Sequence, residues 1–321
     1  SFLRKSIMAP DGYVIVVGDL SQIEPRVLAW IADYHNMLEI FRAGGDPYAT
    51  FGSQMFNIPG LNKDTHPLLR QSAKSALLGC GYQLGWASFS AQLLVGFLGA
   101  PPKRYTKAEA LQLGVTGEHV KRFINNKWHM EKMFEIARTC TDEELLIHCL
   151  AAKAIVEKYR AAAEPVVDFW KLLQERITRS LIEGEVYEHK GVFTMKKEEI
   201  VLVNGMSLKY PNIEICKDER GHTEFRFGTG DKKGKLYAGR ICNNITQGLA
   251  RIVMSDGMLR TAKRYDVLGT VHDEQLDLAP EEEAEEAKAW VHAQMIVEPK
   301  WMPGIPLNAD VGYNKRYGLA K

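Results

Sequence analysis

The chain has 321 residues, of which 45% are hydrophobic, and a formal net charge of +1. This length can bury a sizeable core in one or two domains, and the balanced charge means that any surface for a polyanion must be local. No apolar run approaches the ~20 residues that cross a bilayer, so no membrane partner is expected. Five cysteines without a CxxC pair favour reduced thiols and a cytoplasmic location.

The first half of the chain predicts one strand followed by helices. The run "YVIVVGDL" (residues 13–20) is typical of a buried strand. Helical periodicity then covers about 25–41, about 47–56 and 68–79, and after a break at 98–106 it dominates 107–183.

The second half changes character. Residues 185–240 contain short alternating runs that predict antiparallel strands, followed by a helix over 243–265, a strand–turn–strand over 267–279 and an acidic amphipathic helix over 281–297. A helical block with strand-rich segments on both sides predicts an α+β fold, in which helices are inserted into an antiparallel sheet.

Two acidic positions fall at predicted strand ends. Asp19 ends the first strand in "GDLSQIEPR", and "VHDEQLDL" places His272, Asp273 and Glu274 in a tight turn. Carboxylates converging from two strands of one sheet can hold two divalent cations. The alternatives are a helix-capping aspartate and an ordinary polar turn.

The segment "LLRQSAKSALLGCGYQ" (68–83) predicts a helix with an unusual face. Arg70, Lys74, Leu78 and Tyr82 are spaced by four, so they share one side of the helix. Two cations, an apolar residue and an aromatic ring in this order suit a nucleoside triphosphate. A surface helix with a basic start is the alternative interpretation.

Taken together, these segments resemble family A (DNA polymerase I-like) DNA polymerases over nearly the whole chain. "LRKSIMAPDGYVIVVGDLSQIEPRVLAW" is similar to the first catalytic motif, "RQSAKSALLGCGY" to the finger helix, and "VHDE" to the third motif. "NNITQGLAR" and "IPLNADVGYNKRYG" are similar to later segments of the family, and "VNGMSLKYP" with "LYAGRICNNITQ" is similar to its phage members.

The resemblance implies a right-hand polymerase core with an antiparallel palm sheet and helical fingers. The palm would comprise 1–35 and 185–321 and the fingers 36–184. The thumb would be absent from this chain, so an upstream thumb or exonuclease segment, or a partner chain, is expected. The implied activity is template-directed addition of deoxynucleotides (dNTPs) to a primer 3′-hydroxyl, with release of pyrophosphate, in DNA replication. The implied ligands are two Mg²⁺ ions, primer–template DNA and dNTPs.

The resemblance also implies residue roles. Asp19 and Asp273 would ligate the metals, with the Leu20 carbonyl as a further ligand and Glu274 adjacent. Lys74 would be catalytic and, like Arg70, would hold the triphosphate, while Leu78, Tyr82 and Glu24 would contact the nucleotide. DNA contacts would come from Gln247, Asn243, His272 and Arg26. The basic stretches 121–129 and 231–235 are further candidates for contact with the DNA backbone.

Two positions depart from the family pattern near the nucleotide. Leu78 stands where many members carry Phe or Tyr, which bears on sugar discrimination, and Gln83 replaces a common glycine. Other interpretations stay open at this point: a single-subunit RNA polymerase or reverse transcriptase, a non-catalytic DNA-binding replication fragment, and a nuclease. A nuclease is weaker, because it would give the Arg70–Lys74–Tyr82 face no function. Glu24 favours the DNA polymerase because it would block a ribonucleotide 2′-hydroxyl.

Overall fold

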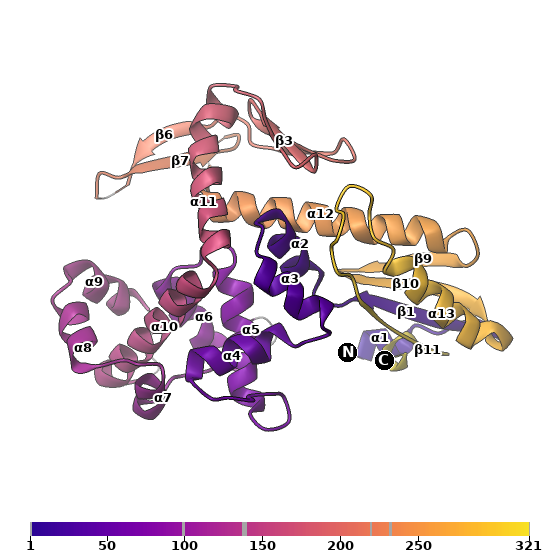
Figure 1. Ribbon diagram of the computed structural model, residues 1–321, viewed down its shortest axis with the longest axis horizontal. Helices are drawn as coiled ribbons and strands as arrows, with labels where there is room; N and C mark the ends of the chain where they lie inside the picture. Colours follow the sequence, from indigo (N-terminus) through magenta and orange to yellow (C-terminus); the bar gives the residue numbers. More distant parts are fainter. Residues whose placement is uncertain (1, 98–99, 137–139, 219, 231–232, 321) are drawn as a thin grey trace. The chain divides into compact units, whose positions relative to one another are not determined.

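A computed structural model describes residues 2–97, 100–136, 140–218, 220–230 and 233–320 (Figure 1). Within it the chain forms two compact units. The first unit comprises Ser1–Ile31, Arg176–Leu236 and Asn243–Lys321, and the second comprises Ala32–Glu175 and Tyr237–Cys242.

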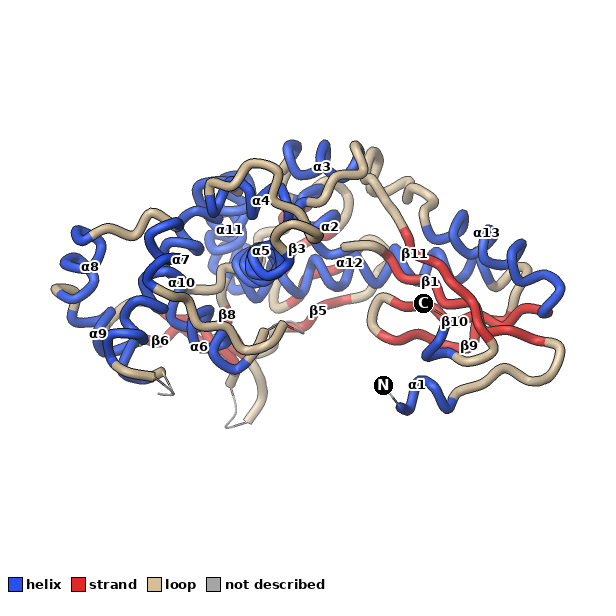
Figure 2. Tube along the Cα trace, turned by 90° about the horizontal axis from the view of Figure 1, so that it is seen from below, coloured by secondary structure: helices blue, strands red, loops and turns tan. Residues whose placement is uncertain are grey.

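The first unit is built on a four-stranded antiparallel sheet in the order β11–β1–β10–β9, drawn in red in Figure 2. Strand β1 (Tyr13–Leu20) pairs with both β10 (Glu274–Pro280) and β11 (Ala309–Asn314), and β9 (Asp266–Val271) pairs with β10. The strand predicted over 13–20 and the strand–turn–strand predicted over 267–279 are both confirmed.

Strand β1 is buried on both faces, which explains its continuous apolar sequence. Ile15 and Val17 pack with Tyr317 in one core cluster. Gly18 points the other way, where a Cβ atom would lie 2.3 Å from the Met295 Sδ. The last residue on the Ile15 and Val17 face is Asp19, because side chains alternate along a strand.

Two smaller antiparallel sheets and several helices complete this unit. The sheet orders are β2–β3–β4–β5 and β6–β7–β8, which confirms the antiparallel strands predicted within 185–240. The bounds are α1 (Phe2–Ser6), α2 (Ile23–Ile31), the π-helix η1 (Ile177–Ile182), β2 (Tyr187–His189), β3 (Phe193–Lys196), β4 (Glu199–Leu202), β5 (Ser207–Lys209), β6 (Glu214–Lys217), β7 (Thr223–Phe227), β8 (Gly234–Leu236), α12 (Ala238–Thr261, with its first turn in the second unit), the 3-10 helices η2 (Glu281–Glu283) and η3 (Tyr317–Leu319), and α13 (Ala284–Met295).

The described part of the second unit is helical. Helix α10 is its centre and contacts α5 through α9, which confirms the helical block predicted from the sequence. The bounds are α3 (His35–Arg42), α4 (Pro47–Phe56), α5 (Pro67–Cys80), α6 (Trp86–Val95), α7 (Lys107–Gln112), α8 (Gly117–Ile124), α9 (Lys127–Glu135), α10 (Asp142–Ala162) and α11 (Glu164–Arg176).

The helix predicted over 25–41 is wrong as a single element. The structure divides it into α2 and α3, and the break contains Asp33 with a φ of +57°. Aspartate tolerates this left-handed conformation better than most residues, and a single such residue is enough to end a helix. The two units also meet in sequence at this break, between Ile31 and Ala32.

Helices together with antiparallel sheets make the fold α+β, as predicted. All five cysteines are free. No helix within the described residues combines the length and apolar character needed to cross a membrane.

Candidate active site

Asp19 and Asp273 are brought to the same end of the central sheet. Asp19 is the second-last residue of β1 and pairs in register with Glu274, the first residue of β10. Asp273 lies in the turn just before β10, and its carbonyl accepts a hydrogen bond from the Leu20 amide at 3.3 Å. The turn is therefore fastened to the end of β1, as the sequence predicts.

The hairpin turn itself contains only His272 and Asp273. His272 adopts a φ of +56°, which allows a tight connection between β9 and β10, and both side chains are exposed. Glu274 is not part of the turn, which corrects the prediction. It is a strand residue that pairs with Val271 and is 9% exposed.

The Glu274 carboxylate is held by groups from both ends of the chain. Tyr317 donates a hydrogen bond to Oε2 at 2.5 Å, and Arg4 forms an ion pair with the same oxygen at 3.1 Å. These partners favour a structural role for Glu274 over a position in a metal shell.

A cavity of about 300 Å³ opens beside Asp273 in the first unit. It is lined by residues of the β1–α2 connection, helix α12 and the β9–β10 turn: Leu20, Ile23, Glu24, Gln247, Ala250, Arg251, Met254, His272 and Asp273. Gln247 and Arg251 are one helical turn apart, and Arg251 Nη1 donates to Thr270 Oγ1 at 3.2 Å. Arg251 was not singled out from the sequence, although its spacing from Gln247 placed it on the same face.

The candidates for DNA contact differ in accessibility. Gln247 and His272 are exposed, and Asn243 is partly buried. Arg26 is only 5% exposed, and its guanidinium donates to the Ser21 and Pro306 carbonyls at 2.8 and 2.7 Å. This burial corrects the prediction for Arg26, because its side chain ties α2 to a distant loop and does not face solvent.

In the second unit, α5 carries the predicted stripe. Arg70, Lys74 and Leu78 are partly exposed, while Ser72 and Ala76 on the opposite side of the helix are buried. The four-residue spacing therefore does define the accessible face of α5.

The two cations of the stripe gather around one aromatic ring. The Arg70 guanidinium lies 5.3 Å and the Lys74 Nζ 5.8 Å from the centroid of Tyr48. Arg70 also pairs with Asp46 through Nε and Oδ2 at 2.5 Å, and Asp46 caps α4 with its other oxygen. Lys74 has no ion-pair partner within the described residues, so its charge is the more available of the two.

Tyr82 lies beyond the end of α5, which stops at Cys80, so the stripe leaves the helix before its last member. Gln83 has a φ of +64°, a conformation that favours glycine, and its Oε1 accepts a hydrogen bond from the Gly239 amide at 3.0 Å. Gln83 thus strains the backbone, and its side chain links this turn to the start of α12.

Comparison with known proteins identifies the family. A model of DNA polymerase family A matches residues 1–164, about half of the chain.

This chain belongs to DNA polymerase family A.

Its relatives agree with this family A assignment. The chain is 26% identical over 319 residues to the DNA polymerase of Bacillus phage SP02. This alignment covers 96% of this chain and 42% of that protein. It is 34% identical over 95 residues to the thermostable DNA polymerase I of Thermus thermophilus, or 30% of this chain and 11% of that protein. The chain therefore spans less than half the length of these relatives.

A solved structure shares the fold. The POL domain of Pol1 from M. smegmatis, in complex with DNA primer-template and dNTP, matches 99% of this chain and 42% of that chain with a TM-score of 0.60 at 20% identity. The family A resemblance and the α+β polymerase-type fold inferred from the sequence are confirmed.

The family A site offers hard oxygen donors suited to Mg²⁺. Asp19 supplies a carboxylate from the end of β1, and Asp273 supplies one from the turn before β10. No cluster of three His, Cys, Asp or Glu residues set to hold a metal occurs among the described residues. Two carboxylates fit Mg²⁺, which takes one or two from the protein and completes its shell with water and phosphates.

A buried acid lies behind the same hairpin. Asp277 in β10 is 0% exposed, and its two oxygens accept hydrogen bonds from the Gln275 Nε2 at 2.9 Å each. Burial raises the pKa of Asp277 to about 7 despite these bonds. This polar pair in the core of a family A hairpin was not anticipated from the sequence.

Proposed function

We propose that this chain is the catalytic core of a template-directed DNA polymerase that adds dNTPs to a primer 3′-hydroxyl and releases pyrophosphate. Family membership supports the polymerase class. The observation that carries the proposal is the register that sets Asp19 on β1 beside Glu274 while Asp273 is fastened to Leu20. The free thiols suit a bacterial or phage-infected host cytoplasm.

In this proposal Asp19, Asp273 and the Leu20 carbonyl hold two Mg²⁺ ions. When bound, these ions activate the primer hydroxyl and stabilise charge on the leaving pyrophosphate. The two carboxylates contribute by fixing the position where the primer end and the phosphates meet. Glu274 is the first residue of β10, and its bonds to Tyr317 and Arg4 support the adjacent turn that carries Asp273.

The first unit is then the palm and the second the fingers. On α5, Lys74 would neutralise the triphosphate and donate a proton to the leaving group, and Arg70 would hold the phosphates after loosening its bond to Asp46. Leu78 and Tyr82 would contact the sugar and base. Lys74 is partly exposed on the accessible side of α5 and has no ion-pair partner among the described residues, which supports this assignment.

The cavity beside Asp273 would receive the primer end and the terminal base pair. Gln247 and His272 line it and would contact DNA there. Asn243 would contact DNA one helical turn before Gln247 in α12. Glu24 also lines it and would exclude a ribonucleotide 2′-hydroxyl. We add Arg251 as a candidate for phosphate contact, because it is a cation on the cavity wall.

The proposal is tested by primer extension on a short primer–template with Mg²⁺ and each of two nucleotide sets, dNTPs or rNTPs. The parent should extend with dNTPs, and Asp19→Asn and Asp273→Asn should each abolish extension. Asp266→Asn is the matched control, because Asp266 is an exposed aspartate at the far end of the same hairpin. It should retain the parent rate.

Three outcomes would contradict the proposal. Absence of extension with either nucleotide set, both by this chain and by a version extended upstream to include a thumb, would favour a non-catalytic DNA-binding fragment. Exclusive use of rNTPs would favour an RNA polymerase. Parent-level extension by Asp19→Asn or Asp273→Asn would remove these carboxylates from the chemistry even if the chain polymerises.

A further inference from the structure

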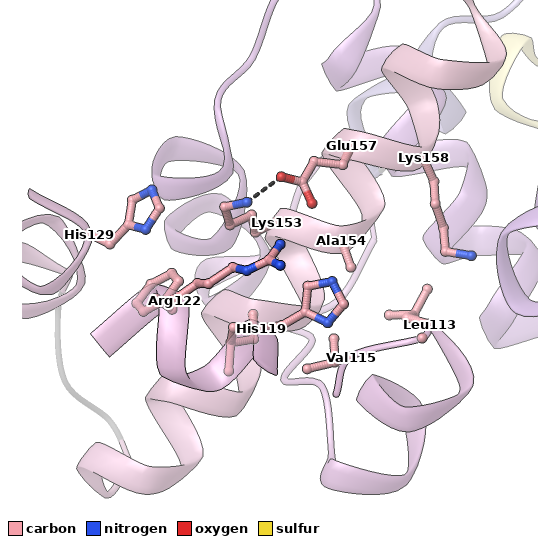
Figure 3. A pocket seen from close by; sticks show the side chains of 12 residues that line it. Leu113, Val115, His119, Arg122, His129, Lys153, Ala154, Glu157 and Lys158 are labelled. Atoms are coloured by element: carbon pink, nitrogen blue, oxygen red, sulfur yellow. Dashed lines mark hydrogen bonds and ion pairs between the residues drawn. The ribbon is translucent and has the colours of Figure 1, made fainter. Parts of the chain in front are cut away.

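A second cavity of about 300 Å³ lies within the helical unit and has no part in the proposed chemistry (Figure 3). It is bounded by the turn between α7 and α8, by one face of α8, by the start of α9 and by the second half of α10. Its lining includes Val115, His119, Arg122, Lys153, Ala154 and Lys158.

The floor of the cavity is apolar. Leu113 and Leu150 are almost fully buried, and Val115 and Ala154 line the space between α8 and α10. Phe123 is 1% exposed. A concave apolar floor of this size suits one large apolar side chain.

The rim of the cavity is basic. The cations that line it are Arg122, Lys153 and Lys158, and the only carboxylate in the described lining is that of Glu157, which pairs with Lys153 (Figure 3). Within the described residues, neither Arg122 nor Lys158 forms an ion pair. Two cations beside an apolar floor are therefore available for carboxylates of a ligand.

His119 adds a directed donor to the rim. It occupies the third position of α8, where its Nδ1 accepts a hydrogen bond from the Thr116 amide at 3.1 Å. Because an amide N–H donates to Nδ1, the neutral ring must carry its proton on Nε2. The helix cap thus sets the tautomer of His119, and Figure 3 shows this side chain projecting from α8 at the cavity.

We propose that this cavity is a docking site for an acidic peptide segment of another protein, in which a large apolar side chain enters the floor and flanking carboxylates bind Arg122, Lys158 and His119. The charge of the rim and the apolar floor select this occupant together. The site lies outside the catalytic residues, so the proposal does not depend on the polymerase activity.

Single-stranded nucleic acid fits the cavity less well. Such strands bind where aromatic faces are open for bases to stack. Here Phe123 is buried, and the His129 ring stacks on it with 4.8 Å between centroids. The floor is otherwise aliphatic, so a base would find little stacking surface although its phosphates would find cations.

The test is fluorescence anisotropy with the whole chain and a fluorescein-labelled peptide of three aspartates followed by leucine and a C-terminal phenylalanine. We expect saturable binding that weakens with salt. Arg122→Glu should weaken it about tenfold or more by reversing a rim charge. Ala154→Trp should weaken it comparably by filling the floor, without changing the net charge.

Lys121→Glu is the matched control. It makes the same charge change on the same helix, but Lys121 is outside the cavity, with a side chain 73% exposed and paired to Glu118 at 3.2 Å. Its effect should stay within about twofold. Peptides with serines in place of leucine and phenylalanine, or asparagines in place of the aspartates, should both lose affinity. Unfolding midpoints establish that each variant is folded.

Several results would overturn the proposal. These are absence of saturable binding by the parent at millimolar peptide, equal losses in Arg122→Glu and Lys121→Glu, and unchanged binding in Ala154→Trp. Displacement of the peptide by an oligothymidylate whose own binding depends on Arg122 but not on Ala154 would assign the surface to nucleic acid instead.

Discussion

The Tyr317 hydroxyl donates a hydrogen bond of 2.5 Å to the Glu274 carboxylate, joining residues 43 positions apart in the chain. Burial and this bond raise the pKa of Tyr317 to about 12. The contact matters because Glu274 begins β10 directly after Asp273. It holds one side of the candidate metal site in place before any ligand arrives.

Tyr317→Phe should therefore destabilise the chain by about 1–3 kcal/mol, the range for a buried hydrogen bond to a charged group. Urea unfolding at neutral pH measures this change. Tyr313→Phe is the matched control, since it loses a hydrogen bond of 2.9 Å to the exposed Glu285 and should cost less than about 1 kcal/mol. Equal losses of unfolding free energy in the two variants would show that the buried contact with Glu274 stabilises the chain no more than the exposed contact with Glu285.

Asp277 should make stability fall as pH rises from about 4 to 7. The folded chain keeps the Asp277 proton until its pKa of about 7, whereas the unfolded chain releases it near 3.8. Since the native state binds more protons between these values, unfolding becomes easier with rising pH, by at most about 4 kcal/mol at ~1.4 kcal/mol per unit.

Asp277→Asn cannot ionise and should remove this slope. In urea unfolding the variant should gain stability relative to the parent as pH rises from 4 to 8. Asp266→Asn changes an exposed residue, so the difference in its stability between pH 4 and pH 8 should equal that of the parent. Parallel stability curves for the parent and Asp277→Asn would contradict the prediction.

Gly239→Ala should disturb the turn that follows α5, at Tyr82 and Gln83. An added Cβ would lie 2.3 Å from the Tyr82 carbonyl oxygen, so the backbone around Gln83 would have to move, at a cost of about 1–3 kcal/mol or more. Gly257→Ala in the same helix is the control, because its nearest atom would be 3.5 Å away. It should stabilise by up to ~1 kcal/mol through helix propensity. In thermal unfolding, Gly239→Ala should lower the midpoint temperature and Gly257→Ala should raise it.

Lys74→Ala tests the proposed role of α5. Single-nucleotide incorporation should show kcat/KM for dNTP lower by about a hundredfold, because a charge that stabilises the transition state is removed. Lys63→Ala removes an exposed lysine from the loop before α5 and should leave both constants unchanged. A Lys74→Ala enzyme with parent kinetics would exclude α5 from phosphate binding.

Features that depend on local spacing were predictable from the residues alone. Strand β1, the β9–β10 hairpin and the accessible stripe on α5 follow from periodicity, since burial on one face repeats every two residues in a strand and about every 3.6 in a helix. The strand-like runs that carry Asp19 and Asp273 also predicted that these residues belong to one sheet.

Contacts with groups that are distant in the chain follow only from how the elements pack in three dimensions. Arg26 is buried because the Pro306 carbonyl, 280 positions away, accepts its hydrogen bond, and Glu274 is held by Arg4, 270 positions away. Gln83 tolerates a left-handed conformation beside Gly239, 156 positions away. Contacts across such separations leave no periodic signal, because they arise from how the elements pack and not from the residues next to them in the chain.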